Sequence, residues 1–207
     1  MRRRYKLLLI IFISFLLVFF IYSFLRKDKF VYVSLGDDLS FNNFTTYNYT
    51  DYLKYYYEDK NIQIYKYADE YNPSDDLYKH INENIGDINY YLRNANLITI
   101  SLGTVELNNY IELNEEIIVN YLNKIYILLN KVSKLNENIF LINMYDDTYE
   151  FVNRKIKEYC QNLQIKYIDR ADINLKYIYQ NNLKTYLTYK GHKQIVDIIV
   201  NSFNNQK

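Results

Sequence analysis

The sequence predicts one α/β domain, a three-layer α/β/α sandwich with a five-stranded parallel sheet. Short continuous apolar runs, typical of strands that are buried on both faces, alternate with longer segments of helical periodicity. The strand candidates are Phe30–Leu35, Ile62–Tyr67, Leu97–Leu102, Ile139–Met144 and Ile165–Ile168. Because strands and helices alternate along the whole domain, parallel strands joined by right-handed crossovers are favoured.

The clearest of the predicted helices is Glu115–Lys134, whose apolar residues recur with a period of about 3.6 residues. Asn114 can cap its amino end, where Glu115 and Glu116 suit the positive end of the helix dipole. Four further helices are expected at Tyr52–Asp59, Ser74–Asn84, Tyr149–Asn162 and Gly191–Phe203.

An apolar segment precedes the domain. Leu7–Leu25 contains no charged residue, and at about 1.5 Å per residue it is long enough to cross a bilayer as a helix. Positive charges are in greater excess before it than after it, which keeps the N-terminus in the cytoplasm and exports the rest. A cleaved signal peptide is the alternative, although its apolar region is usually shorter and a small-x-small cleavage site does not follow here. We expect residues 1–29 to form a cytoplasmic basic N-terminus and an uncleaved transmembrane anchor, and residues 30–207 to form one extracytoplasmic domain at the cell membrane.

Composition and charge exclude several functions. The single cysteine, Cys160, cannot form an internal disulfide or a multi-cysteine metal site. The anchor's flanks carry +6 (four positive charges before it, and three positive minus one negative after it), so the whole-chain charge of +1 leaves −5 for the domain. A mildly acidic domain without a basic stripe is a poor nucleic-acid binder. We expect no nucleic-acid partner and no cofactor, and we interpret the 26 tyrosines as core and surface residues.

Polar residues follow the predicted strands at their carboxyl ends, where parallel α/β sheets bind ligands. We call this edge of the sheet the rim. Its residues are Gly36, Asp37 and Asp38 after the first strand, Gly103, Thr104, Val105 and Glu106 after the third, Tyr145, Asp146 and Asp147 after the fourth, and Asp169 and Arg170 after the fifth.

Several segments resemble the sequence blocks of the SGNH (GDSL-type) esterase family. Gly36–Ser40, which reads Gly-Asp-Asp-Leu-Ser, resembles the Gly-Asp-Ser-Leu block that ends the family's first strand. Leu97–Leu107 resembles the third block, Ile139–Tyr145 the fourth strand, and Tyr186–His192 the last block, while Tyr71–Leu77 is a weak match to the second. The resemblance covers essentially the whole domain and implies the flavodoxin-like strand order 2-1-3-4-5.

The resemblance also implies which positions would carry chemistry, and each of them is substituted. The nucleophile position is Asp38, the oxyanion-hole positions are Tyr71 and Val105, and the Asp and His positions are Leu183 and Tyr186. An ionised carboxylate is a poor acyl nucleophile, valine offers no donor to an oxyanion, and tyrosine is too weak a base at neutral pH. We therefore expect no catalytic residues. The expected pocket-lining residues are Gly36, Asp37, Asp38, Gly103, Glu106, Tyr186 and His192.

The favoured interpretation is a catalytically inactive protein that binds a cell-envelope ligand, a glycan or an acyl ester, or a protein partner. One alternative is an active esterase or deacetylase in which a register shift brings Ser40 near His192. Another is a metal site for Mg²⁺ or Ca²⁺ on Asp37, Asp38 and Glu106, although we expect no metal. His192 falls in the first turn of the last helix, where we expect it to support the helix instead of acting as a base.

Overall fold

A parallel β-sheet forms the centre of the protein. The computed structural model describes residues 12–18, 29–40, 46–68, 73–102, 107, 114–181 and 184–204. The strands of the main sheet are β1 (Val31–Gly36), β2 (Gln63–Ala68), β3 (Leu97–Leu102), β4 (Ile139–Asn143) and β5 (Lys166–Asp169). All neighbours pair in parallel, in the order β2-β1-β3-β4-β5. The predicted sheet and its order are confirmed.

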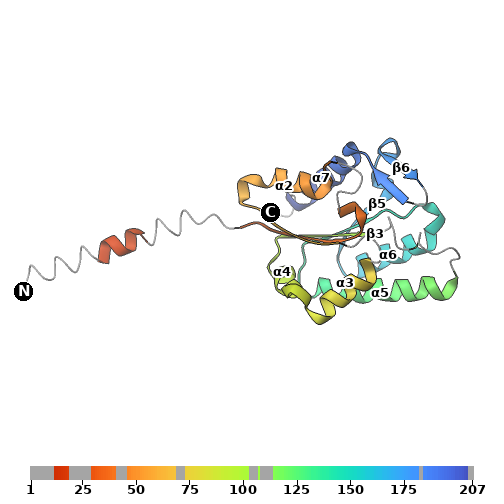
Figure 1. Cartoon of the computed structure of the whole chain (residues 1–207), viewed down its shortest axis with the longest axis horizontal. Coiled ribbons are helices and arrows are strands. Elements are labelled where there is room, and N and C mark those ends of the chain that lie inside the picture. The colour runs from red at the N-terminus through yellow and green to blue at the C-terminus, as the bar shows by residue number, and fades with distance from the viewer. Residues whose placement is uncertain are drawn as a thin grey trace, which may run out of the picture.

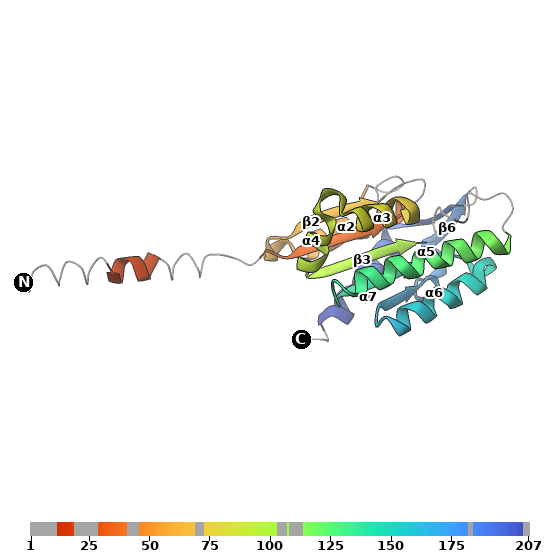
Figure 2. The same cartoon turned by 90° about the horizontal axis from the view of Figure 1, so that it is seen from below.

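Helices cover both faces of this sheet, which confirms the predicted three layers (Figure 1). One face carries α3 (Pro73–Glu83), α4 (Ile88–Asn94), α5 (Glu115–Ser133) and α6 (Glu150–Asn162), and Figure 2 looks onto it. The other face carries α2 (Tyr49–Tyr56) and α7 (Tyr189–Asn204). Short 3-10 turns occur at Asp38–Ser40, Glu58–Lys60, Ile85–Asp87, Asp147–Tyr149, Arg170–Asp172 and Leu175–Tyr177.

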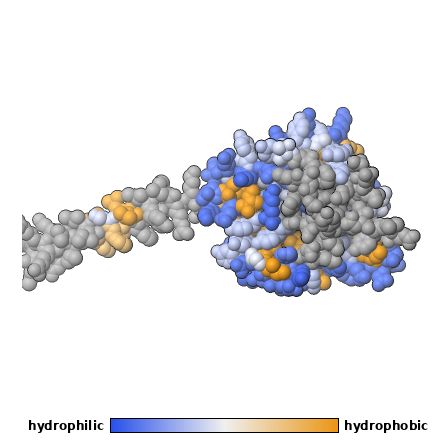
Figure 3. All heavy atoms as spheres, viewed as in Figure 1, coloured by the Kyte–Doolittle hydropathy of each residue, from blue (hydrophilic) through white to orange (hydrophobic). Residues whose placement is uncertain are grey.

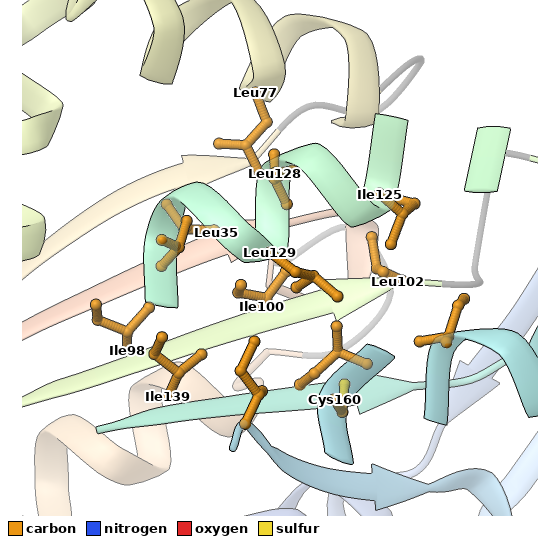
Figure 4. Close-up of a cluster of buried hydrophobic side chains, with 14 of the residues drawn as sticks. Leu35, Leu77, Ile98, Ile100, Leu102, Ile125, Leu128, Leu129, Ile139 and Cys160 are labelled. Atoms are coloured by element: carbon orange, nitrogen blue, oxygen red, sulfur yellow. The ribbon is translucent and has the colours of Figure 1, made fainter. Parts of the chain in front are cut away.

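Each face of the sheet has its own hydrophobic core, because successive side chains of a strand point to opposite faces. Leu35 and Ile100 point toward α5 and α6, where they join Leu128, Leu129 and Cys160 (Figure 4). Burial raises the pKa of the Cys160 thiol to about 12, so this cysteine behaves as an apolar core residue. The second core lies under α2 and α7 and is built from the alternate strand residues.

Helix α2 begins and ends three residues earlier than the predicted Tyr52–Asp59. The cause is a capping box at Asn48. The Asn48 side chain accepts hydrogen bonds from the backbone N–H of Thr50 and Asp51, and the Asp51 carboxylate accepts one from the Asn48 N–H. Two further boundaries, the ends of α3 and α6, lie within one residue of their predictions.

Two features were not predicted. An antiparallel hairpin of β6 (Ile178–Asn181) and β7 (Lys184–Leu187) stands between β5 and α7. Helix α4 has only seven residues and depends on packing, since its buried residues Ile88 and Leu92 lie four apart on one face.

The predicted anchor is described only in part. Of Leu7–Leu25, the described residues are 12–18, which are helical and carry exposed apolar side chains. No helix formed by the described residues is long and apolar enough to cross a membrane. The remainder of the predicted anchor lies outside the described residues, so the anchor stays a prediction.

Candidate functional site

The end of β1 lies unusually close to the end of β3. Gly36 has a φ of +125°, and a Cβ atom added to it would lie 2.1 Å from the Ser101 carbonyl oxygen and 2.6 Å from Ser101 Oγ. Directly after it, the Asp37 N–H donates to both of these Ser101 oxygens, at 3.2 Å each. Because only glycine fits such a close approach, Gly36 fixes where the chain leaves the sheet at the rim.

Asp37 organises the loop that follows β1. Its side chain is fully buried, and Oδ1 accepts a hydrogen bond from the Leu39 N–H at 3.3 Å. Its carbonyl oxygen accepts one from the Ser40 N–H at 3.0 Å. These bonds close a short turn over Asp38–Ser40, a usual role for aspartate in loops. The side chain of Asp38 itself lies outside the described part of the chain.

A chain of buried hydroxyl groups lies beneath this loop. Ser40 Oγ is 2.8 Å from both Tyr49 OH and Ser101 Oγ. Tyr49 OH is in turn 3.2 Å from Thr99 Oγ1, which is 2.7 Å from Tyr32 OH. All five residues are fully buried. We call these residues, Tyr32, Ser40, Tyr49, Thr99 and Ser101, the hydroxyl network.

The hydroxyl network joins the sheet to α2, because Tyr49 is the first residue of that helix. Burial raises the pKa of Tyr32 well above its ordinary value, so its hydroxyl stays protonated and neutral. Neutral hydroxyls that are each both donor and acceptor can satisfy one another without water. The hydroxyl network therefore joins α2 to the sheet through buried hydrogen bonds.

Sequence reasoning missed this network although a signal was present. Tyr32 and Ser34 alternate along β1, and Thr99 and Ser101 alternate along β3, so all four point to the same face. Ser34 pairs with Thr99 in the sheet, which brings the polar residues together. Polar residues that alternate with apolar ones inside these two strands thus indicate a polar cluster on one face of the sheet.

His192 lies in the first turn of α7 and is almost completely buried. Its Nδ1 accepts a hydrogen bond from the backbone N–H of Tyr49 at 3.2 Å, and the two rings stack with centroids 6.4 Å apart. Burial lowers the pKa of His192 to about 4, while the nearby Asp51 carboxylate opposes this shift. The imidazole is therefore neutral at pH 7 and serves the amino end of α2, which Asn48 also caps.

The alternative of a rearranged esterase requires Ser40 and His192 to be in contact. Instead, the two residues form hydrogen bonds to opposite ends of Tyr49. Ser40 contacts the hydroxyl at the tip of that side chain, whereas His192 contacts its backbone nitrogen. Both residues are buried. A serine needs a base within hydrogen-bond reach to become a nucleophile, and these contacts do not provide it.

Other predicted site residues are placed only in part. Tyr186 lies on β7, half-buried, and its ring stacks on Tyr179 with centroids 5.1 Å apart. The following predicted positions lie outside the described residues: Tyr71, Gly103, Val105, Glu106 and Leu183. A shared pocket of Asp38, Glu106, Tyr186 and His192 therefore stays a prediction.

The carboxylates after β4 and β5 serve the local backbone. Asp146 Oδ1 accepts a hydrogen bond from the Thr148 N–H at 3.0 Å, and Oδ2 lies 3.9 Å from Arg170 Nη1. Asp169 and Asp172 form a capping box around the turn that follows β5. Among the described residues, no group of three His, Cys, Asp or Glu side chains could hold a metal ion. The metal alternative remains untested, since Glu106 and the Asp38 side chain are not among them.

Two hollows of the described surface lie away from the rim. A groove of about 860 Å³ runs along the outer side of α2 and α7. Its lining residues are Tyr47, Asp51, Tyr52, Lys54, Tyr55, Tyr56, Glu58, Asn61, Ile62, Lys193, Val196 and Asp197. A second hollow of about 780 Å³ lies at the amino ends of β4 and β5.

The fold is shared with solved esterase structures, whereas no protein-family model and no curated protein matches the sequence. A variant of the acetyl xylan esterase Axe2 from Geobacillus stearothermophilus superposes with a TM-score of 0.60 at 12% identity, over 86% of this chain and 97% of that one. A lipase from a goat rumen metagenome gives 0.59 at 16% identity, over 84% and 97%. AlinE4, an SGNH-hydrolase family esterase, gives 0.52 at 12% identity, over 86% and 97%.

These structures place the chain in a fold class. At such low identities the similarity shows the fold alone. The protein has the SGNH-hydrolase fold, and the resemblance found in the sequence is confirmed at that level.

Proposed function

We propose that this protein is a catalytically inactive member of the SGNH-hydrolase fold that binds a ligand or partner in the cell envelope. Residues 1–29 would anchor it in the cell membrane, with the domain on the extracytoplasmic side. The rim would bind a glycan or an acyl ester, or alternatively a protein partner. Acetylated glycans are the first class to test, because acetyl xylan esterases are among the proteins that share the fold.

The observation that carries the proposal is the way Ser40 and His192 are used. The Ser40 hydroxyl is fully buried and shared between Tyr49 and Ser101. A neutral imidazole has one unprotonated nitrogen that could accept a proton from a serine. In His192 this nitrogen, Nδ1, accepts a hydrogen bond from the Tyr49 N–H instead, and the His192 pKa of about 4 makes the imidazole a weak base. Both side chains therefore form hydrogen bonds to Tyr49 that hold the amino end of α2 in place.

An active esterase with rearranged residues would have to dismantle these contacts. Moving Ser40 toward His192 breaks two buried hydrogen bonds, each with a net value of about 0.5–1.5 kcal/mol, and leaves the hydroxyls of Tyr49 and Ser101 with one partner fewer each. Asp38 at the nucleophile position and Val105 at the oxyanion position would still lack the required chemistry. The contacts therefore favour binding over hydrolysis.

The first test is an assay of ester hydrolysis. We expect the purified protein to release no acetate from acetylated xylan oligosaccharides and to cleave p-nitrophenyl acetate no faster than buffer. Ser40→Ala and His192→Ala variants serve as controls. Turnover that disappears in either variant would refute the proposal and favour the rearranged esterase, whereas a small rate that survives both reflects adventitious catalysis.

The second test measures binding at the rim. The domain should co-sediment with insoluble cell-wall polymer, and an Asp38→Ala variant should be retained less. Glu137→Ala is the matched control, since Glu137 is an exposed acid beyond the opposite ends of the strands. Equal retention of the two variants would show that the rim does not bind the polymer.

The proposed anchor is tested in intact protoplasts. Added protease should remove the domain and leave a short protected fragment that contains residues 7–25. Full protection of the chain would contradict the proposed orientation.

A further inference from the structure

The chain enters the domain at the amino ends of the strands, the edge opposite to the rim. Gln63, at the start of β2, donates its N–H to the Phe30 carbonyl at 2.8 Å. The Phe30 ring stacks on Tyr57 after α2, with centroids 4.3 Å apart, and meets Phe203 near the end of α7 at 6.1 Å. We call this edge, which these four residues mark, the amino edge.

The predicted anchor allows little distance between this edge and the membrane. The apolar run ends at Leu25, so only the four residues 26–29 separate it from Phe30. At about 3.3–3.6 Å per residue they reach roughly 14 Å at most. The six residues of β1 add about 20 Å in the direction of the rim, more than the tether can span.

We propose that the amino edge faces the lipid headgroups and that the rim points away from the membrane. This inference rests on the anchor in the proposed function. With this orientation, the ligand that binds at the rim is a polymer or a solute outside the membrane, because the rim could not reach an acyl chain within the bilayer.

The side chains near the amino edge suit a bilayer interface. Tyr55 and Tyr56, at the carboxyl end of α2, are 78% and 49% exposed. Lys60 Nζ lies 4.7 Å from the Tyr57 ring centroid and 5.7 Å from the Phe30 ring centroid. Tyrosine and lysine are the residues favoured at the level of the headgroups. Figure 3 shows a hydrophobic patch within a hydrophilic surround at this end of the domain.

Charges of both signs lie near the amino edge, so attraction to charged lipid would contribute little to the orientation. The short tether of residues 26–29 is therefore its main cause. Glu58 and Asp59 lie beside Lys60 in the turn after α2. The inference therefore predicts contact with zwitterionic headgroups and does not require anionic lipid.

The test uses the absence of tryptophan from the sequence. Tyr55→Trp, Tyr47→Trp and Tyr179→Trp each introduce one tryptophan at an exposed position. Tyr55 is at the end of α2 near the amino edge, Tyr47 precedes the other end, and Tyr179 is on the hairpin at the opposite end of the domain from the start of β1 (Figures 1 and 2). Tyr56→Trp replaces Tyr55→Trp if the latter does not fold.

The full chain of each variant is reconstituted into phosphatidylcholine vesicles that contain a lipid with a nitroxide on its headgroup. We expect tryptophan quenching to fall in the order 55, 47, 179, and to be several-fold stronger at 55 than at 179. Uniform or reversed quenching in vesicle-bound protein would overturn the orientation and leave the anchor intact. Failure of the chain to float with the vesicles would overturn the anchor and the orientation together, while the proposal about hydrolysis would be unaffected.

Discussion

Replacement of Gly36 by alanine should destabilise the domain strongly. The new methyl group would lie 2.1 Å from the Ser101 carbonyl oxygen, at a φ of +125° that L-residues rarely adopt. Such backbone strain costs about 1–3 kcal/mol, and forcing a methyl group into a packed site costs about 1–3 kcal/mol more. The sum, roughly 2–6 kcal/mol, is a large part of the roughly 5–15 kcal/mol by which domains are usually stable.

Gly86→Ala is the matched control, because Gly86 also has a positive φ, +62°, but has no atom within 4 Å of its added Cβ. It should cost only about 1–2 kcal/mol. Both variants can be measured in a fragment that starts at Lys29, since the two hydrophobic cores lie within it. Urea unfolding followed by circular dichroism gives the free energies. An equal loss in the two variants would show that β1 and β3 do not meet closely at Gly36 and would refute the reasoning.

Three further predictions concern buried groups. The pKa of His192 is lowered from 6.5 to about 4, so its neutral form stabilises the fold above pH 6.5 and this contribution is lost as the pH falls from 6.5 to about 4. The free energy of unfolding should fall by about 3 kcal/mol over this range, at about 1.36 kcal/mol per pKa unit. Urea titrations at several pH values should show this fall in the unchanged protein and should not show it in the His192→Gln variant. Ser40→Ala should lower the free energy of unfolding by about 1–3 kcal/mol, because two buried hydrogen bonds, to Tyr49 and to Ser101, are lost at about 0.5–1.5 kcal/mol each; an unchanged urea midpoint would contradict this. The Cys160 thiol, with a pKa raised to about 12, should react with a thiol reagent at pH 8 only after unfolding, and rapid labelling of the native protein would be inconsistent with its burial.

Most of the fold could be predicted because its signals are local and strong. Leu97–Leu102 is a continuous apolar run, and it was predicted with the bounds that β3 has. The α5 helix carries its own cap, Asn114, and a long apolar periodicity, and it ends one residue before the prediction. The parts that were missed depend on tertiary contacts. The seven residues of α4 are too few for an independent helix, and the β6–β7 hairpin has no continuous apolar run.

The site was harder to predict, because its hydrogen bonds join residues that are distant in the sequence. The motif after the first strand points to Gly36 and Asp37, and both lie at the contact with β3. Composition presents Tyr49 only as one of 26 tyrosines, yet it connects Ser40 with His192. Composition alone cannot distinguish such a tyrosine from a surface one, since its role arises only when α2 and α7 pack on the same face of the sheet.

The most direct test of the central claim is whether the protein has a nucleophilic serine. A fluorophosphonate reacts with activated serines whatever the natural substrate is, and intact-mass spectrometry detects one adduct per chain. A serine esterase of the same fold serves as the positive control. The contacts of Ser40 and His192 predict no adduct on the native protein. An adduct that peptide mapping assigns to Ser40, and that is absent in His192→Ala, would contradict the account.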